Sequence, residues 1–213
     1  MVAYIHMIYP DTKLEEQLWS QGYKIVVGLD EAGRGPLAGP VVASAVVMSN
    51  KDCLIPLVRD SKTMSEKQRT ETYEEIKEKS KAYGIGIVSS RDIDLIGIQK
   101  AVLQAMTISL EVVERKLGKK ADYIIADGEN ILSIRNYKMQ KIKKGDSYHY
   151  SIAAASVLAK VTRDRIMREY HEKYPEYGFD THVGYGTKKH MDALKKYGAI
   201  SIHRRSFGPV KNL

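Results

Sequence analysis

The segment VVGLDEAGRGPLAGPVV, at residues 26–42, constrains the fold more than any other part of the chain. Its two valine-rich ends predict two strands, because β-branched residues favour the pleated surface of a sheet. Between them, Asp30 and Glu31 stand side by side at the end of the first strand, and Gly-Arg-Gly follows at 33–35. Adjacent carboxylates repel each other and are costly to bury. The segment therefore predicts a positively charged partner for this pair.

The glycines of this segment do not match the common phosphate-binding loops. A dinucleotide fingerprint needs the spacing G-x-G-x-x-G at the start of a helix. Here Gly33, Gly35 and Gly39 are spaced one residue too far, and a proline and a valine-rich strand follow. No Lys-Ser or Lys-Thr pair closes the segment as in a P-loop. Two explanations remain: a backbone that approaches another molecule closely, or a tight turn.

The remaining pattern predicts an α/β fold. The expected strands are at 23–30, 40–48, 83–90, 121–130 and within 134–146, and the expected helices are at 12–20, 65–82, 91–118, 151–174 and 187–197. From Leu95 to Leu117 apolar residues recur every three or four positions, which predicts one amphipathic helix that ends at Gly118. Hairpin-type strands followed by helix–strand–helix units favour a mixed sheet with helices on its faces.

Length and composition favour one soluble domain. A chain of 213 residues can form one sizeable α/β domain. No run is long enough to span a bilayer, and the N-terminal segment lacks the basic and apolar regions of a secretory signal. The single cysteine, Cys53, cannot form a disulfide within the chain, which suits a reducing compartment. We therefore expect a cytoplasmic protein with no membrane partner.

The charge distribution points to a polyanionic partner. Lys and Arg exceed Asp and Glu by 34 to 26, which gives a formal net charge of +8. The excess gathers in basic clusters at 115–120, 138–144, 159–168 and 203–206. Any one cluster could be a solvated surface, but all of them together favour a nucleic acid. In the third cluster, Lys160 and Arg163 share a helix face and would reach phosphate or lie in solvent.

Carboxylates follow three of the predicted strands. Asp30 and Glu31 end the first strand, Asp127 ends the fourth, and Asp146 follows the fifth. If these three strands are neighbours, the carboxylates converge at one edge of the sheet, where function concentrates in open α/β folds. Oxygen ligands without His or Cys are typical of Mg²⁺ or Mn²⁺ and not of zinc. Such ions would offset the repulsion between Asp30 and Glu31.

The ordered motifs of the chain resemble the bacterial ribonuclease HII family. They are DEAGRGPLAGPV, DSKTMSE, ADG, KGD, SIAAASVLAKVTRD, HVGYGTKKH and HRRSFGPV, and they extend from about Gly28 to Val210. The resemblance implies a ribonuclease H-like fold, with a five-stranded mixed sheet flanked by helices and a C-terminal helical segment. It implies one catalytic domain over 1–213, with a lead-in at about 1–22 and a substrate-binding segment at about 170–213.

The resemblance also implies an activity. A ribonuclease HII hydrolyses the RNA strand of RNA–DNA hybrids and cleaves on the 5′ side of a single ribonucleotide embedded in duplex DNA. The enzyme would act on these nucleic acids as a monomer and leave 3′-hydroxyl and 5′-phosphate ends. Two ions, Mg²⁺ or Mn²⁺, would activate water and stabilise the leaving oxygen. The catalytic metal ligands that the resemblance implies are Asp30, Glu31, Asp127 and Asp146.

The same resemblance assigns residues to the substrate. Gly33, Arg34 and Gly35 would read the ribose 2′-hydroxyl, and a side chain on either glycine would hold the strand away. Lys62 of DSK would contact phosphate, or else be a solvated loop lysine. Tyr185 of GYGT would pack beside the sugar at the RNA–DNA junction, or else be an amphipathic core residue.

Two other functions remain open from the residues alone. A metal-dependent DNA resolvase or other nuclease of the same broad fold would share the carboxylates but would not need to recognise a 2′-hydroxyl. A non-catalytic nucleic-acid-binding module would share the basic clusters but would not need acids at the ends of three strands. Cleavage of an all-DNA substrate would favour the first, and metal-independent binding without cleavage would favour the second.

Overall fold

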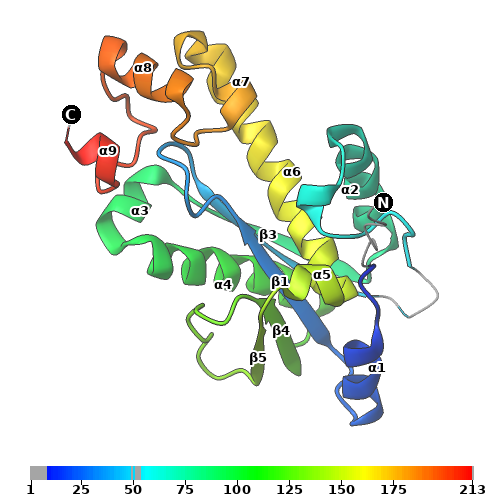
Figure 1. Cartoon of the computed structure of the whole chain (residues 1–213). Coiled ribbons are helices and arrows are strands. Elements are labelled where there is room, and N and C mark those ends of the chain that lie inside the picture. Colours follow the sequence, from blue (N-terminus) through cyan, green and yellow to red (C-terminus); the bar gives the residue numbers. More distant parts are fainter. Residues whose placement is uncertain (1–8, 49, 51–53, 213) are drawn as a thin grey trace, which may run out of the picture.

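The structure is a computed structural model that describes residues 9–48, 50 and 54–212 (Figure 1). Cys53 and the first eight residues, on which the expectations about disulfides and a secretory signal partly rested, lie outside the described residues. Within the described part of the chain, no helix combines the length and the apolar character needed to cross a membrane.

The described part of the chain contains five strands, nine α-helices and two 3₁₀ helices. The strands are β1 (Val26–Ala32), β2 (Val41–Val47), β3 (Ala82–Val88), β4 (Tyr123–Asp127) and β5 (Met139–Ile142). The α-helices are α1 (Lys13–Ser20), α2 (Glu66–Lys79), α3 (Ser90–Ile96), α4 (Ile98–Leu117), α5 (Gly145–Tyr148), α6 (Tyr150–Lys173), α7 (Phe179–His182), α8 (Lys188–Tyr197) and α9 (Gly208–Lys211). Two 3₁₀ helices, η1 (Ser61–Thr63) and η2 (Pro175–Tyr177), lie in the connections.

The strands form one mixed sheet in the order β3-β2-β1-β4-β5. Strand β2 is antiparallel to β1 and β3, whereas β4 is parallel to both β1 and β5. The register pairs Gly28 with Ile125 and Asp127 with Ile142. Strands β1, β4 and β5 are therefore neighbours whose carboxyl ends meet at one edge. This arrangement confirms the expected fold class and the adjacency on which the predicted convergence of carboxylates depended.

Helices cover both faces of the sheet (Figure 1). Leu29 of β1 belongs to the same apolar cluster as Met106 of α4, on one face of the sheet, and Val46 of β2 belongs to the cluster of Ala154 of α6, on the other face. Gly28 is paired with Val46 and precedes Leu29, so it points to the face covered by α6. Gly28 lies under α6 so closely that a Cβ there would be 2.4 Å from the carbonyl carbon of Ser151. Asp30 shares this face of β1, which places its carboxylate under α6.

The segment 91–118 differs from its prediction. It forms two helices, α3 and α4, which are separated at Gly97, where φ is 79°. A residue with this backbone conformation ends the helical hydrogen-bond ladder, so the apolar stripe before the break no longer aligns with the stripe after it. Val102, Met106 and Leu110 are buried as predicted, but Leu95 is 72% exposed.

The C-terminal helices pack mainly against the loop of residues 33–40, which joins β1 to β2. Phe179, Leu194 and Ile202 form one apolar cluster with Leu37 and with residues from the end of α6. The backbone joins the same parts, because the N–H of Leu37 donates to the carbonyl of Gly184 at 2.8 Å. The C-terminal tail, residues 174–212, therefore lies beside the glycine-rich loop, residues 33–40.

Candidate active site

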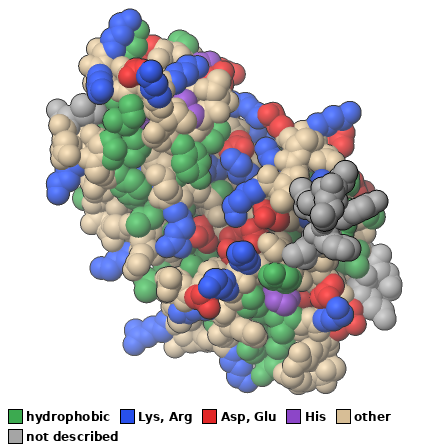
Figure 2. Space-filling model, viewed as in Figure 1, with side chains coloured by type: hydrophobic (Ala, Val, Ile, Leu, Met, Phe, Trp, Pro, Cys, Tyr) green, Lys and Arg blue, Asp and Glu red, His purple; other side chains and the backbone are tan. Residues whose placement is uncertain are grey.

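Three carboxylates meet at the carboxyl edge of β1, β4 and β5. Asp30 lies in β1, Asp127 ends β4, and Asp146 lies in α5, directly after β5. Each offers one carboxylate oxygen, and these oxygens lie within 4.8 Å of one another. Asp30 and Asp127 line a cleft of about 340 Å³, and Asp146 lies beside them. Figure 2 shows acidic side chains gathered in a hollow of this face, with Lys and Arg at its border.

The electrostatics of this acidic cluster call for a cation. Burial raises the pKa of Asp30 well above its usual value, and the nearby charges of Glu31 and Asp127 raise it further. A hydrogen bond from Ser156 offsets only part of this effect. The pKa of Asp127 is raised by burial and by Asp146. Carboxylates with raised pKa values are held together at a cost that a bound cation would remove.

Glu31, the next residue of β1, lines the same cleft, but its oxygens are not part of the triad of Asp30, Asp127 and Asp146. Its Oε1 accepts a hydrogen bond from Arg34 Nη1 at 3.0 Å. Its Oε2 is buried and has no hydrogen-bond partner among the described residues. A buried carboxylate oxygen without a partner and an all-oxygen donor set both fit a hard divalent cation such as Mg²⁺ or Mn²⁺.

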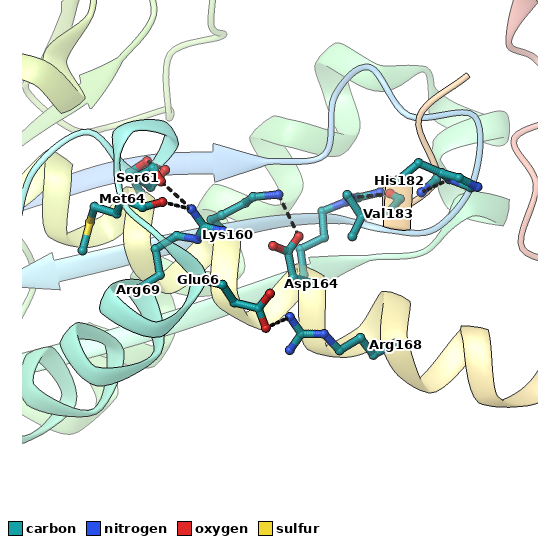
Figure 3. Close-up of polar contacts among 12 residues, drawn as sticks. Ser61, Met64, Glu66, Arg69, Lys160, Asp164, Arg168, His182 and Val183 are labelled. Carbon is teal, nitrogen blue, oxygen red and sulfur yellow. Dashed lines mark hydrogen bonds and ion pairs between the residues drawn. The ribbon is translucent and has the colours of Figure 1, made fainter. Parts of the chain in front are cut away.

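Lys62 stands beside the triad, on η1. Its Nζ lies 3.4 Å from Oδ2 of Asp146, although 77% of the side chain is exposed. Arg69 Nη1 donates to the carbonyls of Ser61 and Met64, on both sides of Lys62 (Figure 3). The hydroxyls of Ser61 and Ser156 are 3.0 Å apart, which ties η1 to α6. Lys62 is therefore a cation held at the edge of the cleft.

The glycine-rich loop and Tyr185 form another wall of this cleft, which is lined by Gly33, Arg34, Gly35 and Tyr185. The Tyr185 side chain comes from the loop between α7 and α8 and is 47% exposed, so it is not a core residue. A Cβ placed on Gly35 would lie 3.6 Å from Cε1 of this ring. The structure thus brings together all nine residues that the sequence assigned to metal or substrate.

A buried arginine turns the glycine-rich loop toward the cleft. Arg204 is fully buried, and its guanidinium donates to the carbonyls of Gly33 at 2.6 Å and Arg34 at 3.0 Å. The C=O and N–H of a trans peptide point in opposite directions. The N–H groups of Arg34 and Gly35 therefore point away from Arg204, and no group in the described chain accepts a hydrogen bond from either.

A second buried arginine joins the two walls of the cleft. Arg163 of α6 donates to the carbonyls of Pro40 at 3.0 Å, Ala38 at 3.1 Å and Val183 at 2.9 Å. The expectation that Arg163 reaches phosphate or solvent is wrong, because these carbonyls enclose its guanidinium and leave it 1% exposed. Figure 3 shows Val183 beside His182, in the loop that leads to Tyr185. Arg163 therefore fixes this loop relative to the glycine-rich loop.

The sequence pattern did not reveal these two arginines. Arg163 and Arg204 belong to basic clusters whose sequence predicts a surface for a polyanion. Both side chains are instead buried, and burial lowers their pKa values to about 10 and about 9. They stay charged at neutral pH, with carbonyl oxygens as partners. Arg205, next to Arg204, is exposed as the surface interpretation predicted. Nothing in the local sequence distinguishes the buried arginine from its exposed neighbour.

The two glycines of the GRG triplet should respond differently to alanine. At Gly33, where φ is 98°, a Cβ would lie 2.2 Å from Nε of Arg163, whereas at Gly35 its nearest neighbour is the Tyr185 ring at 3.6 Å. We expect Gly33→Ala to lower the free energy of unfolding by about 2 kcal/mol or more. Gly35→Ala should change it by less than about 0.5 kcal/mol. Urea denaturation measures both values, and equal losses would contradict this division.

Comparison with known proteins agrees with this geometry. The family model described as "Ribonuclease HII" matches residues 27–210. Ribonuclease HII of Caldanaerobacter subterraneus subsp. tengcongensis is 49% identical over 193 residues, which cover 91% of this chain and 78% of the relative. Ribonuclease HII of Clostridioides difficile is 50% identical over 199 residues, which cover 93% of this chain and 75% of the relative.

Solved structures agree as well. Ribonuclease H2 from Pyrococcus horikoshii OT3 superimposes with a TM-score of 0.74 at 25% identity, covering 88% of this chain and 95% of that chain. Ribonuclease HII from Archaeoglobus fulgidus, solved in complex with PCNA, superimposes with a TM-score of 0.72 at 26% identity, covering 86% of this chain and 95% of that chain. The chain therefore belongs to the ribonuclease HII family of metal-dependent enzymes and is a ribonuclease H, which acts on RNA–DNA hybrids.

Proposed function

We propose that this ribonuclease H also cleaves duplex DNA on the 5′ side of a single embedded ribonucleotide and leaves 3′-hydroxyl and 5′-phosphate ends. One observation carries the proposal: Arg34 and Gly35, whose backbone N–H groups have no acceptor in the described chain, line the same cleft as Asp30, Asp127 and Tyr185. The 2′-hydroxyl is the group by which a protein distinguishes RNA from DNA. Free N–H donors beside the carboxylates suit the recognition of that hydroxyl next to the cleaved bond.

The proposed roles divide the cleft into a metal side and a substrate side. Asp30, Asp127 and Asp146, with Glu31, would hold Mg²⁺ or Mn²⁺, because all their donors are oxygens and one buried oxygen lacks a partner. When bound, two such ions would supply Lewis-acid stabilisation of the attacking and leaving oxygens. On the substrate side, Lys62 would contact a phosphate oxygen.

The remaining recognition falls to the glycine-rich loop and Tyr185. Arg34 and Gly35 would donate backbone hydrogen bonds to the 2′-hydroxyl, and the absence of a side chain at Gly35 would leave room for the ribose. The exposed face of the Tyr185 ring would pack on the adjacent deoxyribose. Each group would then test one side of an RNA–DNA junction.

Cleavage of a DNA duplex that contains one ribonucleotide, with both product ends mapped, tests the proposal. We expect one cut on the 5′ side of the ribonucleotide in Mg²⁺ or Mn²⁺ and none in excess chelator. Equal cleavage of an all-DNA duplex would instead indicate a nuclease without 2′-hydroxyl recognition. Metal-independent binding without any cleavage would indicate a binding module, and full activity in chelator would contradict the metal site.

Tyr185→Ala should change substrate preference more than stability. About half of the Tyr185 side chain is exposed, and the residue lines the cleft. Loss of its packing on a sugar should lower the rate on the one-ribonucleotide duplex, relative to a uniform RNA–DNA hybrid, by about tenfold. Tyr197, which is 49% exposed on α8 and lies outside the cleft, offers the matched control Tyr197→Ala. A Tyr185→Ala protein that melts much earlier but keeps the wild-type rate ratio would show that the ring is structural.

We also propose the organisation in which this site works. All the proposed site residues come from one chain, which supports action as a monomer. Tyr185 lies in the segment 170–213, which supports the assignment of that segment to substrate binding within a single catalytic domain over 1–213. The single cysteine of the sequence supports a reducing compartment such as the cytoplasm.

A further inference from the structure

Three buried histidines lie behind the loop that carries Tyr185. His182, His190 and His203 are 7%, 0% and 2% exposed, and none of them lines the cleft. The rings of His182 and His190 are stacked with their centroids 4.7 Å apart, and the rings of His190 and His203 are 5.2 Å apart. The edge of Phe179 also packs on His190, at 5.4 Å between centroids. These rings therefore have little freedom to rotate.

The hydrogen bonds of His203 and His190 have only one consistent direction. The backbone N–H of Ile200 donates to Nδ1 of His203 at 3.0 Å, so a neutral His203 carries its proton on Nε2. This Nε2 lies 3.0 Å from Nε2 of His190, which must then be the acceptor. His190 therefore carries its proton on Nδ1, which donates to the carbonyl oxygen of Tyr185 at 2.9 Å.

His182 holds the other side of the same loop. Its Nδ1 accepts from the N–H of Gly184 at 3.2 Å, so its Nε2 donates to the carbonyl of Tyr177 at 2.9 Å. The N–H of Tyr185 in turn donates to the carbonyl of His182 at 2.8 Å. The Tyr185 N–H is thus held by the carbonyl of His182, and the Tyr185 carbonyl accepts from both the N–H of Thr187 at 2.8 Å and Nδ1 of His190. The bond from Thr187 joins neighbouring residues, whereas the bond from His190 ties the loop to the buried rings.

The chain of hydrogen bonds requires neutral rings, because a proton on His203 Nδ1 or on His190 Nε2 would remove an acceptor. Burial is the largest cause that lowers the pKa of each of the three rings, and it brings the pKa of His203 to about 4 with the help of nearby His190. At neutral pH all three rings are therefore uncharged. An imidazole that accepts a hydrogen bond at one nitrogen and donates one at the other fixes its two partners relative to each other, because the ring is rigid. An apolar side chain of similar size makes neither hydrogen bond.

We propose that His190 and His203 are positioning residues for Tyr185. They fix its place in the cleft through one directed chain of hydrogen bonds, from the N–H of Ile200 to His203, from His203 to His190, and from His190 to the carbonyl of Tyr185. This position in turn sets the preference for an RNA–DNA junction. The proposal rests on the proposed function of Tyr185 at the junction. A merely structural role would instead require only that the three rings fill the space between α7, α8 and the segment that carries His203.

The tautomers of the wild-type protein test the hydrogen-bond chain without any mutation. In the full chain labelled with ¹⁵N-histidine, long-range ¹H–¹⁵N correlation spectra at pH 7 distinguish protonated from unprotonated ring nitrogens. We expect the Nδ1–H tautomer for His190 and the Nε2–H tautomer for His182 and His203. An Nε2–H tautomer of His190, or a charged ring at His190 or His203, would overturn the proposal.

Two variants of His190 separate its two hydrogen bonds. The amide of Asn occupies the position of Nδ1, so His190→Asn keeps a donor for Tyr185, whereas the longer Gln reaches the position of Nε2 and keeps only an acceptor for His203. We expect His190→Gln to lower the ratio of rates on the one-ribonucleotide duplex and the uniform hybrid by about tenfold, and His190→Asn to stay within about threefold of wild type. Folded variants that both keep, or equally lose, the wild-type ratio would overturn the proposal.

Two further variants complete the experiment. His171 lies on α6, outside the stacked rings and the cleft, so His171→Gln should leave the ratio unchanged. Tyr185→Ala tests the underlying function separately. If it leaves the ratio unchanged, the proposed role of Tyr185 fails while the tautomers still decide the hydrogen-bond chain. If it lowers the ratio and His190→Gln does not, the positioning role of His190 fails and the role of Tyr185 stands.

Discussion

Asp30→Asn should nearly abolish hydrolysis of an RNA–DNA hybrid and, at the same time, stabilise the metal-free protein. Asp30 is a buried member of the acidic triad, and burial and its acidic neighbours raise its pKa well above the ordinary value. Outer-shell changes around metal sites already cost about 10–100-fold in affinity or activity. Loss of a ligand should therefore lower the rate by more than about a hundredfold.

The stabilisation has a defined pH dependence. Because the pKa of Asp30 is higher in the folded than in the unfolded state, its stabilising contribution is complete below the ordinary value of 3.8. That contribution is lost as the pH rises through the folded-state pKa, so at neutral pH the charged group destabilises the metal-free protein. Asn resembles the protonated carboxyl at every pH. The gain in melting temperature should be smallest at acidic pH and largest at neutral pH.

Thermal unfolding in chelator and in Mg²⁺, over a range of pH, measures both effects. Added Mg²⁺ should raise the melting temperature of the wild type more than that of Asp30→Asn, since a ligand that binds the folded state stabilises it. Asp192, which is exposed on α8, provides the control Asp192→Asn with unchanged activity and stability. Wild-type turnover by Asp30→Asn, or a lower melting temperature in chelator at pH 7, would contradict the assignment.

Arg204→Met should strongly destabilise the folded protein. The guanidinium donates to the carbonyls of Gly33, Arg34, Gly39 and Pro40, and the side chain is fully buried. Methionine fills similar space but leaves most of these oxygens without a donor. Unsatisfied buried groups cost about 1–3 kcal/mol each, so we expect a total loss of about 3–5 kcal/mol in the free energy of unfolding.

The same substitution should also slow hydrolysis at a temperature where the variant is folded, because the N–H groups of Arg34 and Gly35 would lose their fixed orientation. The neighbouring residue offers a close control: Arg205 is exposed, and Arg205→Met should change the free energy of unfolding by less than about 0.5 kcal/mol. Urea denaturation and hybrid cleavage give the two readouts. Similar stability losses in both variants would show that Arg204 does not organise the glycine-rich loop.

Local sequence patterns were enough to predict the strands and the convergence of Asp30, Asp127 and Asp146. Alternating or continuous apolar runs predicted β1 to β5, and acids at the ends of three of these strands predicted a site for a hard metal ion. The order of motifs indicated the ribonuclease HII family, which the comparisons confirmed. Gly97 shows the limit of periodicity, because apolar spacing continues through a residue whose positive φ divides the predicted helix into α3 and α4.

Long-range packing, in contrast, assigns different roles to side chains of one type. Arg204 is buried and Arg205 is exposed because the carbonyls that enclose Arg204 come from residues 33–40, far away in the sequence. Both Gly33 and Gly35 line the cleft, but a side chain on Gly33 would collide with Arg163, whereas a Cβ on Gly35 would only contact the Tyr185 ring. The role of a guanidinium, a glycine or an imidazole depends on the groups that the tertiary fold places around it. These groups come from distant parts of the chain, so the local sequence does not reveal them.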